Sequence, residues 1–213
     1  MAQLVFYYST MFSGKSLDLI KNVDEYTYRG RKVLVFTTSI DERNGKITND
    51  VQTSKITTRF HLDKTLDAYL IERHDVFKMA QEQKPQCIFL DEAQFVSAAK
   101  ILELARIVDE LHISVICYGL KNDSNGNLFE GSETLINYAD KLVEQKVMCF
   151  HCGKRKAKFN LRKENEKYVF GGPQVAIEKK DTEKKIEVTY EVVCRSCYMN
   201  IMKQVTGKNY VKI

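Results

Sequence analysis

The segment Ser9-Thr-Met-Phe-Ser-Gly-Lys-Ser16 constrains the fold more than any other part of the chain. It follows an apolar run, Leu4–Tyr8, that is typical of a strand, and it precedes Leu17–Lys21, which has the character of a helix. In such a unit the backbone N–H groups of the loop and of the helix N-terminus point at an anion. The pattern predicts a phosphate-binding loop made of Ser9, Thr10, Met11, Phe12, Ser13, Gly14, Lys15 and Ser16.

Within this loop, Lys15 is expected to reach the β- and γ-phosphates of a nucleoside triphosphate, and the Ser16 hydroxyl to bind Mg²⁺. The loop departs from the usual G-x-x-x-x-G-K-[ST] pattern because Ser9 stands at its first position. Glycine is freer than serine in a sharp turn. The alternative interpretation is that Gly-Lys-Ser is a chance tripeptide between a strand and a helix.

Short apolar runs alternate with amphipathic segments over most of the chain. The runs have the composition of strands covered on both faces: Leu4–Tyr8, Val33–Thr37, Cys87–Leu90, Val115–Tyr118 and a further one near Leu142–Met148. The segments between them have helical spacing: Ser16–Arg29, Leu66–Glu82, Ala98–Leu111 and Ser132–Ala139. This alternation predicts an α/β fold with a mostly parallel sheet flanked by helices.

The composition changes near Met148, after which two cysteine pairs, a Gly-Gly-Pro turn and a lysine-rich stretch follow. We therefore expect a nucleotide-binding core over residues 1–148, a zinc-binding domain over residues 149–205 and a tail over residues 206–213. The polar segment Asp41–Thr58 is predicted to be a long loop.

Composition and charge narrow the class of protein only a little. The 213 residues fit one domain with a small appendage, and a hydrophobic content of 44% suffices for a core. The net charge of +5 is spread along the chain, so it suits a small anionic ligand as well as nucleic acid. No apolar run is long enough to cross a bilayer and no signal-peptide pattern is present, which predicts a cytoplasmic protein with no membrane partner.

Two acids, Asp91 and Glu92, follow the candidate strand Cys87–Leu90. In P-loop proteins an Asp in this place supports Mg²⁺, directly or through water. Adjacent side chains at a strand end point to opposite sides, so Asp91 is assigned to the metal and Glu92 to the base for an incoming hydroxyl. The alternative is a pair of solvated loop acids.

The trio Asp41-Glu-Arg43 follows the second candidate strand and is therefore expected at the same edge of the sheet. Asp41 would join the water shell of the metal, and Arg43 would neutralise charge on a transferring phosphoryl group. A solvated loop trio is the alternative interpretation.

Four of the six cysteines form two C-x-x-C pairs, Cys149/Cys152 and Cys194/Cys197. This spacing predicts a four-thiolate zinc site, and four protein ligands leave no open position, so the zinc is expected to be structural. A chance or redox arrangement is the alternative. His151 is interpreted as a surface residue, and Cys87 and Cys117, which lie inside apolar runs, as core residues.

In this order, the phosphate loop, Asp91-Glu-Ala-Gln-Phe95, Tyr118-Gly-Leu120 and the two C-x-x-C pairs resemble the zinc-containing (type II) thymidine kinases, with a bacterial-like phosphate loop. The resemblance runs from Ala2 to about Met202. It implies a P-loop, RecA-like core and transfer of the γ-phosphoryl group of ATP to the 5′-hydroxyl of thymidine or deoxyuridine, in nucleotide salvage for DNA synthesis. It also implies a homotetramer and feedback inhibition by dTTP.

Carried onto this chain, the family pattern makes Glu92, Arg43 and Lys15 catalytic. It adds Asp41, Asp91, Ala93 and Gln94 to the nucleotide-binding loop residues. The residues expected around the nucleoside are Met11, Phe95, Leu120, Ser124, Val175, Ala176, Ile177 and Tyr190. Of these, residues 175–177 and Tyr190 belong to the family's lasso, a loop that closes over the nucleoside.

The chain departs from the family pattern at two places. Ser124 stands where the family usually has an aromatic residue, and Glu178–Glu187 is an apparent insertion where the family has a Gly-Gly turn. A zinc-ribbon ATPase that binds nucleic acid is the competing interpretation, and a catalytically inactive homologue is a third. The core is small for a motor ATPase and no basic–aromatic stripe is present, so we expect no nucleic-acid partner.

Overall fold

The computed structural model describes residues 1–39, 53–57, 65–174 and 186–207. Contacts between residues divide the chain into two compact units, and the chain passes between them several times. Unit 1 consists of Met1–Tyr8, Gly14–Lys121 and Glu130–Gln145. Unit 2 consists of Ser9–Ser13, Asn122–Phe129 and the chain from Lys146 onward.

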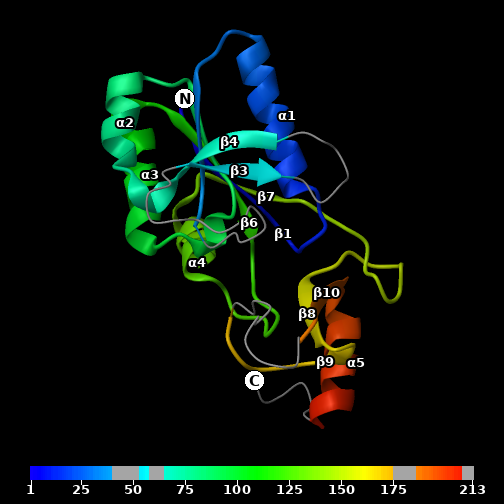
Figure 1. Cartoon of the computed structure of the whole chain (residues 1–213). Helices are drawn as coiled ribbons and strands as arrows, with labels where there is room; N and C mark the ends of the chain where they lie inside the picture. Colours follow the sequence, from blue (N-terminus) through cyan, green and yellow to red (C-terminus); the bar gives the residue numbers. More distant parts are fainter. Residues whose placement is uncertain (40–52, 58–64, 175–185, 208–213) are drawn as a thin grey trace. The chain divides into compact units, whose positions relative to one another are not determined.

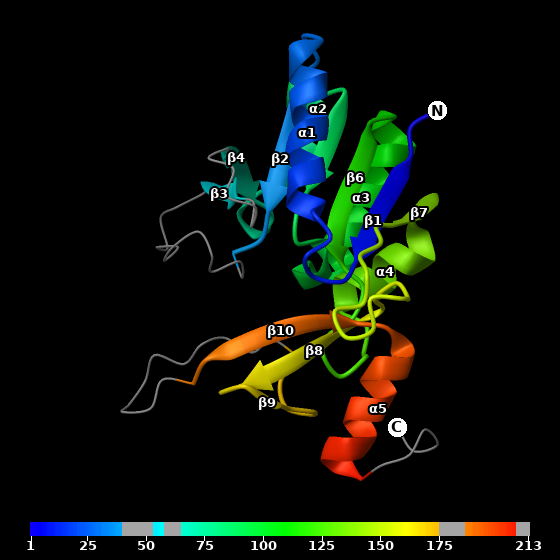
Figure 2. The same ribbon diagram turned by 90° about the vertical axis from the view of Figure 1, so that its right-hand side faces the viewer.

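Unit 1 contains a seven-stranded sheet in the order β3-β4-β2-β5-β6-β1-β7 (Figures 1 and 2). The strands are β1 (Leu4–Ser9), β2 (Val33–Thr37), β3 (Thr53–Thr57), β4 (Thr65–Leu70), β5 (Cys87–Leu90), β6 (Ser114–Leu120) and β7 (Lys141–Glu144). Strand β2 is parallel to β4 and β5, β5 to β6, and β1 to β7, while β3 is antiparallel to β4. The predicted α/β class with a mostly parallel sheet flanked by helices is confirmed.

Four helices accompany this sheet: α1 (Lys15–Tyr28), α2 (Val76–Gln83), α3 (Ala98–Leu111) and α4 (Glu130–Tyr138). Side chains fix two of the helix starts, because Asp75 accepts a hydrogen bond from the Lys78 N–H and Ser97 accepts one from the Lys100 N–H. Two short 3₁₀ helices, η2 (Ile71–Arg73) and η3 (Ala93–Phe95), precede α2 and α3.

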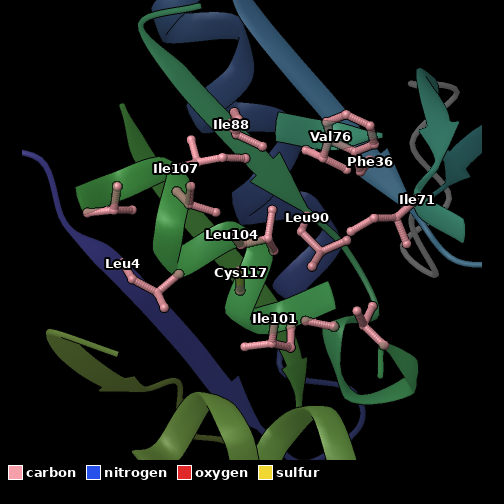
Figure 3. Close-up of a cluster of buried hydrophobic side chains, with 14 of the residues drawn as sticks. Leu4, Phe36, Ile71, Val76, Ile88, Leu90, Ile101, Leu104, Ile107 and Cys117 are labelled. Carbon is pink, nitrogen blue, oxygen red and sulfur yellow. The ribbon is translucent and has the colours of Figure 1, made fainter. Parts of the chain in front are cut away.

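The apolar core of unit 1 has two layers, one on each face of the sheet. Leu19, Ile20 and Val23 of α1 pack on one face, against a cluster that includes Val35 and Phe89. Helices α2, α3 and α4 cover the opposite face (Figure 1). There the alternate residues Phe36, Ile88 and Leu90 meet Ile101, Leu104 and Ile107 of α3 (Figure 3). Burial on both faces explains the near-continuous apolar runs of these strands.

Cys87 and Cys117 are fully buried in this sheet, which confirms that they are core residues. Burial raises the pKa of the Cys87 thiol to about 12, so the group stays protonated and unreactive at neutral pH. No helix in the described part of the chain is long and apolar enough to span a membrane.

The helix predicted over Leu66–Glu82 is wrong in its first part. Residues Thr65–Leu70 form strand β4, and the helix begins only at Val76. Ala68 and Leu70 are buried while Asp67 is exposed, which is the period of two that marks a strand. Pairing with β2 therefore overrode a spacing that also fits a helix.

The segment Asp41–Thr58, predicted to be a loop, contains strand β3. The remaining residues of that segment lie outside the described ranges.

Unit 2 contains a three-stranded antiparallel sheet in the order β10-β8-β9, followed by a helix. The elements are β8 (Phe159–Glu164), β9 (Lys167–Tyr168), β10 (Val188–Val193) and α5 (Arg195–Thr206). Leu161, Val193 and Tyr198 lie in a small core shared with Cys149 and Cys194. The sequence analysis predicted none of these elements, because charged residues interrupt the apolar pattern of this segment.

The approach of α4 to η3 depends on Gly131. A Cβ atom at this position would lie 2.3 Å from the Ala93 carbonyl oxygen and 2.6 Å from that of Val96. We expect Gly131→Ala to destabilise the protein by roughly 1–3 kcal/mol, because backbone must shift to admit the methyl group. Thermal unfolding measures the effect, and Asn137→Ala, at an exposed position of the same helix, is the control. A melting temperature equal to that of the control would contradict the close packing.

Candidate active site and zinc site

Helix α1 begins at Lys15, directly after Gly14. Gly14 has a φ of 81°, in the left-handed region that glycine adopts without strain, so a glycine is required here. It offers no side chain to cap the first turn, and the positive end of the helix dipole is thereby left for an anion. Lys15 is buried, with 8% of its surface exposed.

The Ser16 hydroxyl donates a hydrogen bond of 3.0 Å to Oδ2 of Asp91. Asp91 follows β5 and is 2% exposed, and its Oδ1 accepts the N–H of Glu92 at 3.0 Å. The two residues assigned to Mg²⁺ from sequence are thus in contact, although 75 positions separate them. A hydroxyl and a carboxylate are the hard oxygen ligands that Mg²⁺ prefers, so this pair fits the ion.

Glu92 has a φ of 52° and a ψ of 36°, an uncommon conformation for a residue with a side chain. Its carboxylate accepts a hydrogen bond of 2.5 Å from Nε2 of Gln94. The other end of the same amide, Oε1, accepts the backbone N–H of Leu120 at 2.9 Å. Gln94 is 1% exposed and therefore links the Glu92 carboxylate to the end of β6. The sequence assigned Gln94 to nucleotide binding but did not reveal this contact.

Gly119 makes this link possible. A Cβ atom there would lie 2.9 Å from Oε1 of Gln94 and 3.1 Å from its backbone nitrogen. Any side chain at this position would therefore displace the amide that holds Glu92. This close approach explains why the Tyr118-Gly-Leu120 motif has glycine at its centre.

The first part of the phosphate loop, Ser9–Ser13, belongs to unit 2. Ser9 ends β1 and does not have a positive φ, so serine is tolerated where the usual pattern has glycine. Its hydroxyl donates to the Thr10 carbonyl oxygen at 2.8 Å and lies 2.6 Å from the Ser13 hydroxyl. Phe12 has a φ of 60° and is 45% exposed.

Asn160 of β8 holds two segments of unit 2 together. Its Oδ1 accepts the N–H of Met11 at 2.8 Å, and its Nδ2 donates to the Asn122 carbonyl oxygen at 3.2 Å. Asn160 is 2% exposed. The sequence analysis missed this residue, because no local pattern marks an asparagine whose partners lie so far away in the chain.

The sulfur atoms of Cys149, Cys152, Cys194 and Cys197 all lie within 4.8 Å of one another. The first pair lies on a tight turn, in which the Gly153 N–H donates to the Cys149 carbonyl oxygen at 3.0 Å and Gly153 has a φ of 60°. The second pair begins helix α5, with Cys194 at its N-cap. Both pairs thus point their sulfurs at one spot, as a tetrahedral metal site requires.

Backbone N–H groups, burial and the neighbouring sulfurs shift the pKa values of these thiols in opposite directions. Backbone N–H groups, first that of Lys154, lower the pKa of Cys152 to about 6. Burial and the neighbouring sulfurs raise the pKa of Cys197 to about 12. Four thiolates so close together repel one another, and a divalent ion such as Zn²⁺ relieves that repulsion.

His151 is exposed and bonds to the Glu191 carboxylate at 2.8 Å, so it is a surface residue as predicted.

Comparison with known proteins agrees with these features. Residues 2–198 match the family model described as thymidine kinase. The chain is 38% identical to thymidine kinases from Streptococcus pyogenes serotype M28, over 94% of this chain and 98% of that protein, and from Lactobacillus johnsonii, over 96% and 100%. The thymidine kinase of Vibrio vulnificus is also 38% identical, over 98% of this chain and all of its own length.

The chain belongs to the thymidine kinase family. Among solved structures, the Pif1 helicase of Candida albicans aligns with 68% of this chain and 36% of its own, at a TM-score of 0.38 and 15% identity. That likeness is too distant to bear on function.

The remaining residues expected from the family pattern divide between the two units. In unit 1, Ala93 and Phe95 lie in η3, and Leu120 ends β6. In unit 2, the buried Ser124 accepts the Tyr198 hydroxyl on its carbonyl oxygen at 2.8 Å, and Tyr190 lies in β10, half-buried. The expected residues outside the described ranges are Asp41, Arg43, Val175, Ala176 and Ile177.

Unit 2 also contains a clamp on the Gly171-Gly172-Pro173 turn, which precedes the expected lasso residues. Nη2 of the buried Arg162 donates to the Gly171 carbonyl oxygen at 2.8 Å, and Nη1 to that of Pro173 at 3.4 Å. Oδ1 of Asn125 accepts the Gly171 N–H at 2.7 Å. The sequence analysis missed both side chains, although the Gly-Gly-Pro turn itself was visible.

If the four sulfurs hold a structural zinc ion, Cys152→Ser should abolish stoichiometric zinc and lower the melting temperature, because a hydroxyl is a poor zinc ligand. Elemental analysis of the purified protein measures one zinc per chain in the parent and much less in the variant. Cys117→Ala is the control, since it removes a buried thiol far from the cluster in sequence and should keep the metal. Full zinc content in Cys152→Ser would remove this residue from the ligand set.

Proposed function

We propose that this chain is a thymidine kinase that transfers the γ-phosphoryl group of ATP to the 5′-hydroxyl of thymidine or deoxyuridine. The observation that carries the proposal is the bonded series Ser16–Asp91 and Glu92–Gln94–Leu120. In this series the Ser16 hydroxyl of the phosphate loop donates a hydrogen bond to the Asp91 carboxylate. Gln94 separately holds the neighbouring Glu92 carboxylate. Full-length similarity to thymidine kinases supports the nucleoside as the acceptor.

The phosphate side of the reaction requires little covalent chemistry from the protein, because positioning and charge neutralisation dominate. The N-terminal amides of α1 and the Lys15 ammonium would bind the β- and γ-phosphates. The Ser16 hydroxyl and Asp91 would hold Mg²⁺, directly or through water, and the ion when bound neutralises charge on the phosphates. Arg43 would add a further positive charge, with Asp41 in the metal's water shell.

The acceptor side depends on Glu92. A bond forms between the 5′-oxygen and the γ-phosphorus as the bond from that phosphorus to the bridging oxygen of ADP breaks. The proton of the 5′-hydroxyl passes to the Glu92 carboxylate. Gln94 would hold that carboxylate in one orientation, which reduces the entropy lost when the hydroxyl arrives.

The nucleoside would be bound by Met11, Phe95, Leu120 and Ser124, together with Tyr190 and residues 175–177 of the lasso. The zinc ion would be structural and would fix the two ends of the segment that contains the lasso. A homotetramer, feedback inhibition by dTTP and a cytoplasmic location complete the proposal. The homotetramer and the feedback inhibition rest on the family alone, and the cytoplasmic location is the expectation drawn from the sequence.

The function is tested by offering thymidine, deoxyuridine, deoxycytidine and deoxyguanosine separately with ATP and Mg²⁺. We expect the monophosphates of thymidine and deoxyuridine, with stoichiometric ADP. ATP consumption stimulated by DNA or RNA but not by thymidine would instead support the nucleic-acid-binding ATPase.

Glu92→Gln should lower kcat by roughly 10²-fold or more while ATP binding stays nearly intact, because the amide cannot take the proton. Steady-state kinetics with thymidine and calorimetric ATP titration measure the two effects. Glu110→Gln, which removes an exposed carboxylate paired with Arg106 on α3, is the matched control. A kcat within a factor of two of that of the control would exclude Glu92 as the base.

A further inference from the structure

Two consecutive threonines stand at the carboxyl end of β2, Thr37 as its last residue and Thr38 directly after it, and both have a buried hydroxyl. Thr37 is 1% exposed and Thr38 is 0% exposed. Neither Oγ1 atom has a hydrogen-bond partner among the residues that the structure describes. Buried hydroxyls are almost always hydrogen-bonded, so each such group needs an explanation.

The position of Thr37 follows from the register of the sheet. Phe36 of β2 is paired with Leu90 of β5, and the Asp91 N–H donates to the Phe36 carbonyl oxygen at 2.9 Å. We infer from one further step of this register that Thr37 lies beside Asp91, which directly follows β5. The two residues are equally inaccessible, at 1% and 2% exposure.

The alternation of side chains separates the two threonines. Val35 and Phe89 pack on the α1 face of the sheet, so Thr37 and Asp91, two positions further along each strand, belong to that face. The bond from Ser16 of α1 to Asp91 agrees with this assignment. Thr38 continues the face of Phe36, which is covered by α2, α3 and α4.

We propose that the Thr37 hydroxyl is a further positioning residue for phosphoryl transfer, which binds an oxygen of the hydrated Mg²⁺–nucleotide complex beside Asp91. The inference rests on the proposed function. Mg²⁺ keeps several of its waters in proteins, and each water needs acceptors and donors around it. A threonine hydroxyl can both accept and donate, so it suits a water in the outer shell of the ion.

The melting temperature of Thr37→Val distinguishes a role in nucleotide binding from a purely structural role of the hydroxyl. Valine has nearly the same shape as threonine, and a hydroxyl without a partner contributes nothing favourable to the fold. Thr37→Val should therefore keep or raise the melting temperature, because it removes a buried polar group. If the hydroxyl serves the fold through an interaction elsewhere in the chain, the melting temperature should fall.

The test measures ADP binding by calorimetry, with and without Mg²⁺, in the full-length protein. We expect Thr37→Val to bind ADP with Mg²⁺ roughly tenfold more weakly than the parent, and ADP without Mg²⁺ equally well. Thr37→Ser should restore most of the difference, since it keeps the hydroxyl. Thr38→Val, the same change on the other face of the sheet, should bind both forms like the parent.

Three results would overturn the inference: Mg²⁺-dependent ADP binding in Thr37→Val equal to that of the parent, an equal loss in Thr38→Val, or a clear fall in the melting temperature of Thr37→Val. Failure of the proposed function is distinguishable from these, because the parent itself would then show no Mg²⁺-dependent ADP binding and no thymidine phosphorylation.

Discussion

Parallel pairing of the strands in unit 1 brings the carboxyl ends of β2 and β5 to one edge of the sheet. The position of the two acids Asp91 and Glu92 depends on this pairing. The Ser16–Asp91 hydrogen bond joins the first turn of α1 to that edge. Glu92 follows at once, and its carboxylate is held by Gln94. In an open parallel sheet, ligands bind at this edge because the loops there are free to vary while the strands fix their starting points.

The site also depends on places where backbone and side chains approach closely. Glu92 is held with a positive φ, which stores strain that the surrounding contacts must offset. Gly119 leaves room for the Gln94 amide, and Gly131 lets α4 approach the carbonyl oxygens of η3. Glycine is needed at these two positions because a side chain would not fit, whereas Gly14 is needed because its backbone has a positive φ.

The features visible in the sequence were those with local signatures. Leu4–Tyr8 and Cys87–Leu90 were recognisable as strands because burial on both faces gives continuous apolar runs. The phosphate loop and the cysteine pairs were recognisable because their chemistry fixes short spacings. Strand β4 was mistaken for a helix, since the i, i+4 spacing of Leu66 and Leu70 also fits a helix until the pairing with β2 is known. The contacts of Gln94, Asn160 and Arg162 were not predictable, because their partners are distant in sequence or have no motif.

Unit 2, which contains the four-cysteine cluster, is assembled from three stretches of chain. The buried Asn160 finds one partner at Met11 and the other at Asn122, and the Tyr198 hydroxyl finds its acceptor at Ser124. A fragment that began at residue 146 would lose all three interactions and expose the groups that make them. Unit 2 is therefore not a portable module. Adding this unit to a core, or removing it, would also require changes in the loops at residues 9–13 and 122–129, which supply the partners of Asn160 and Tyr198.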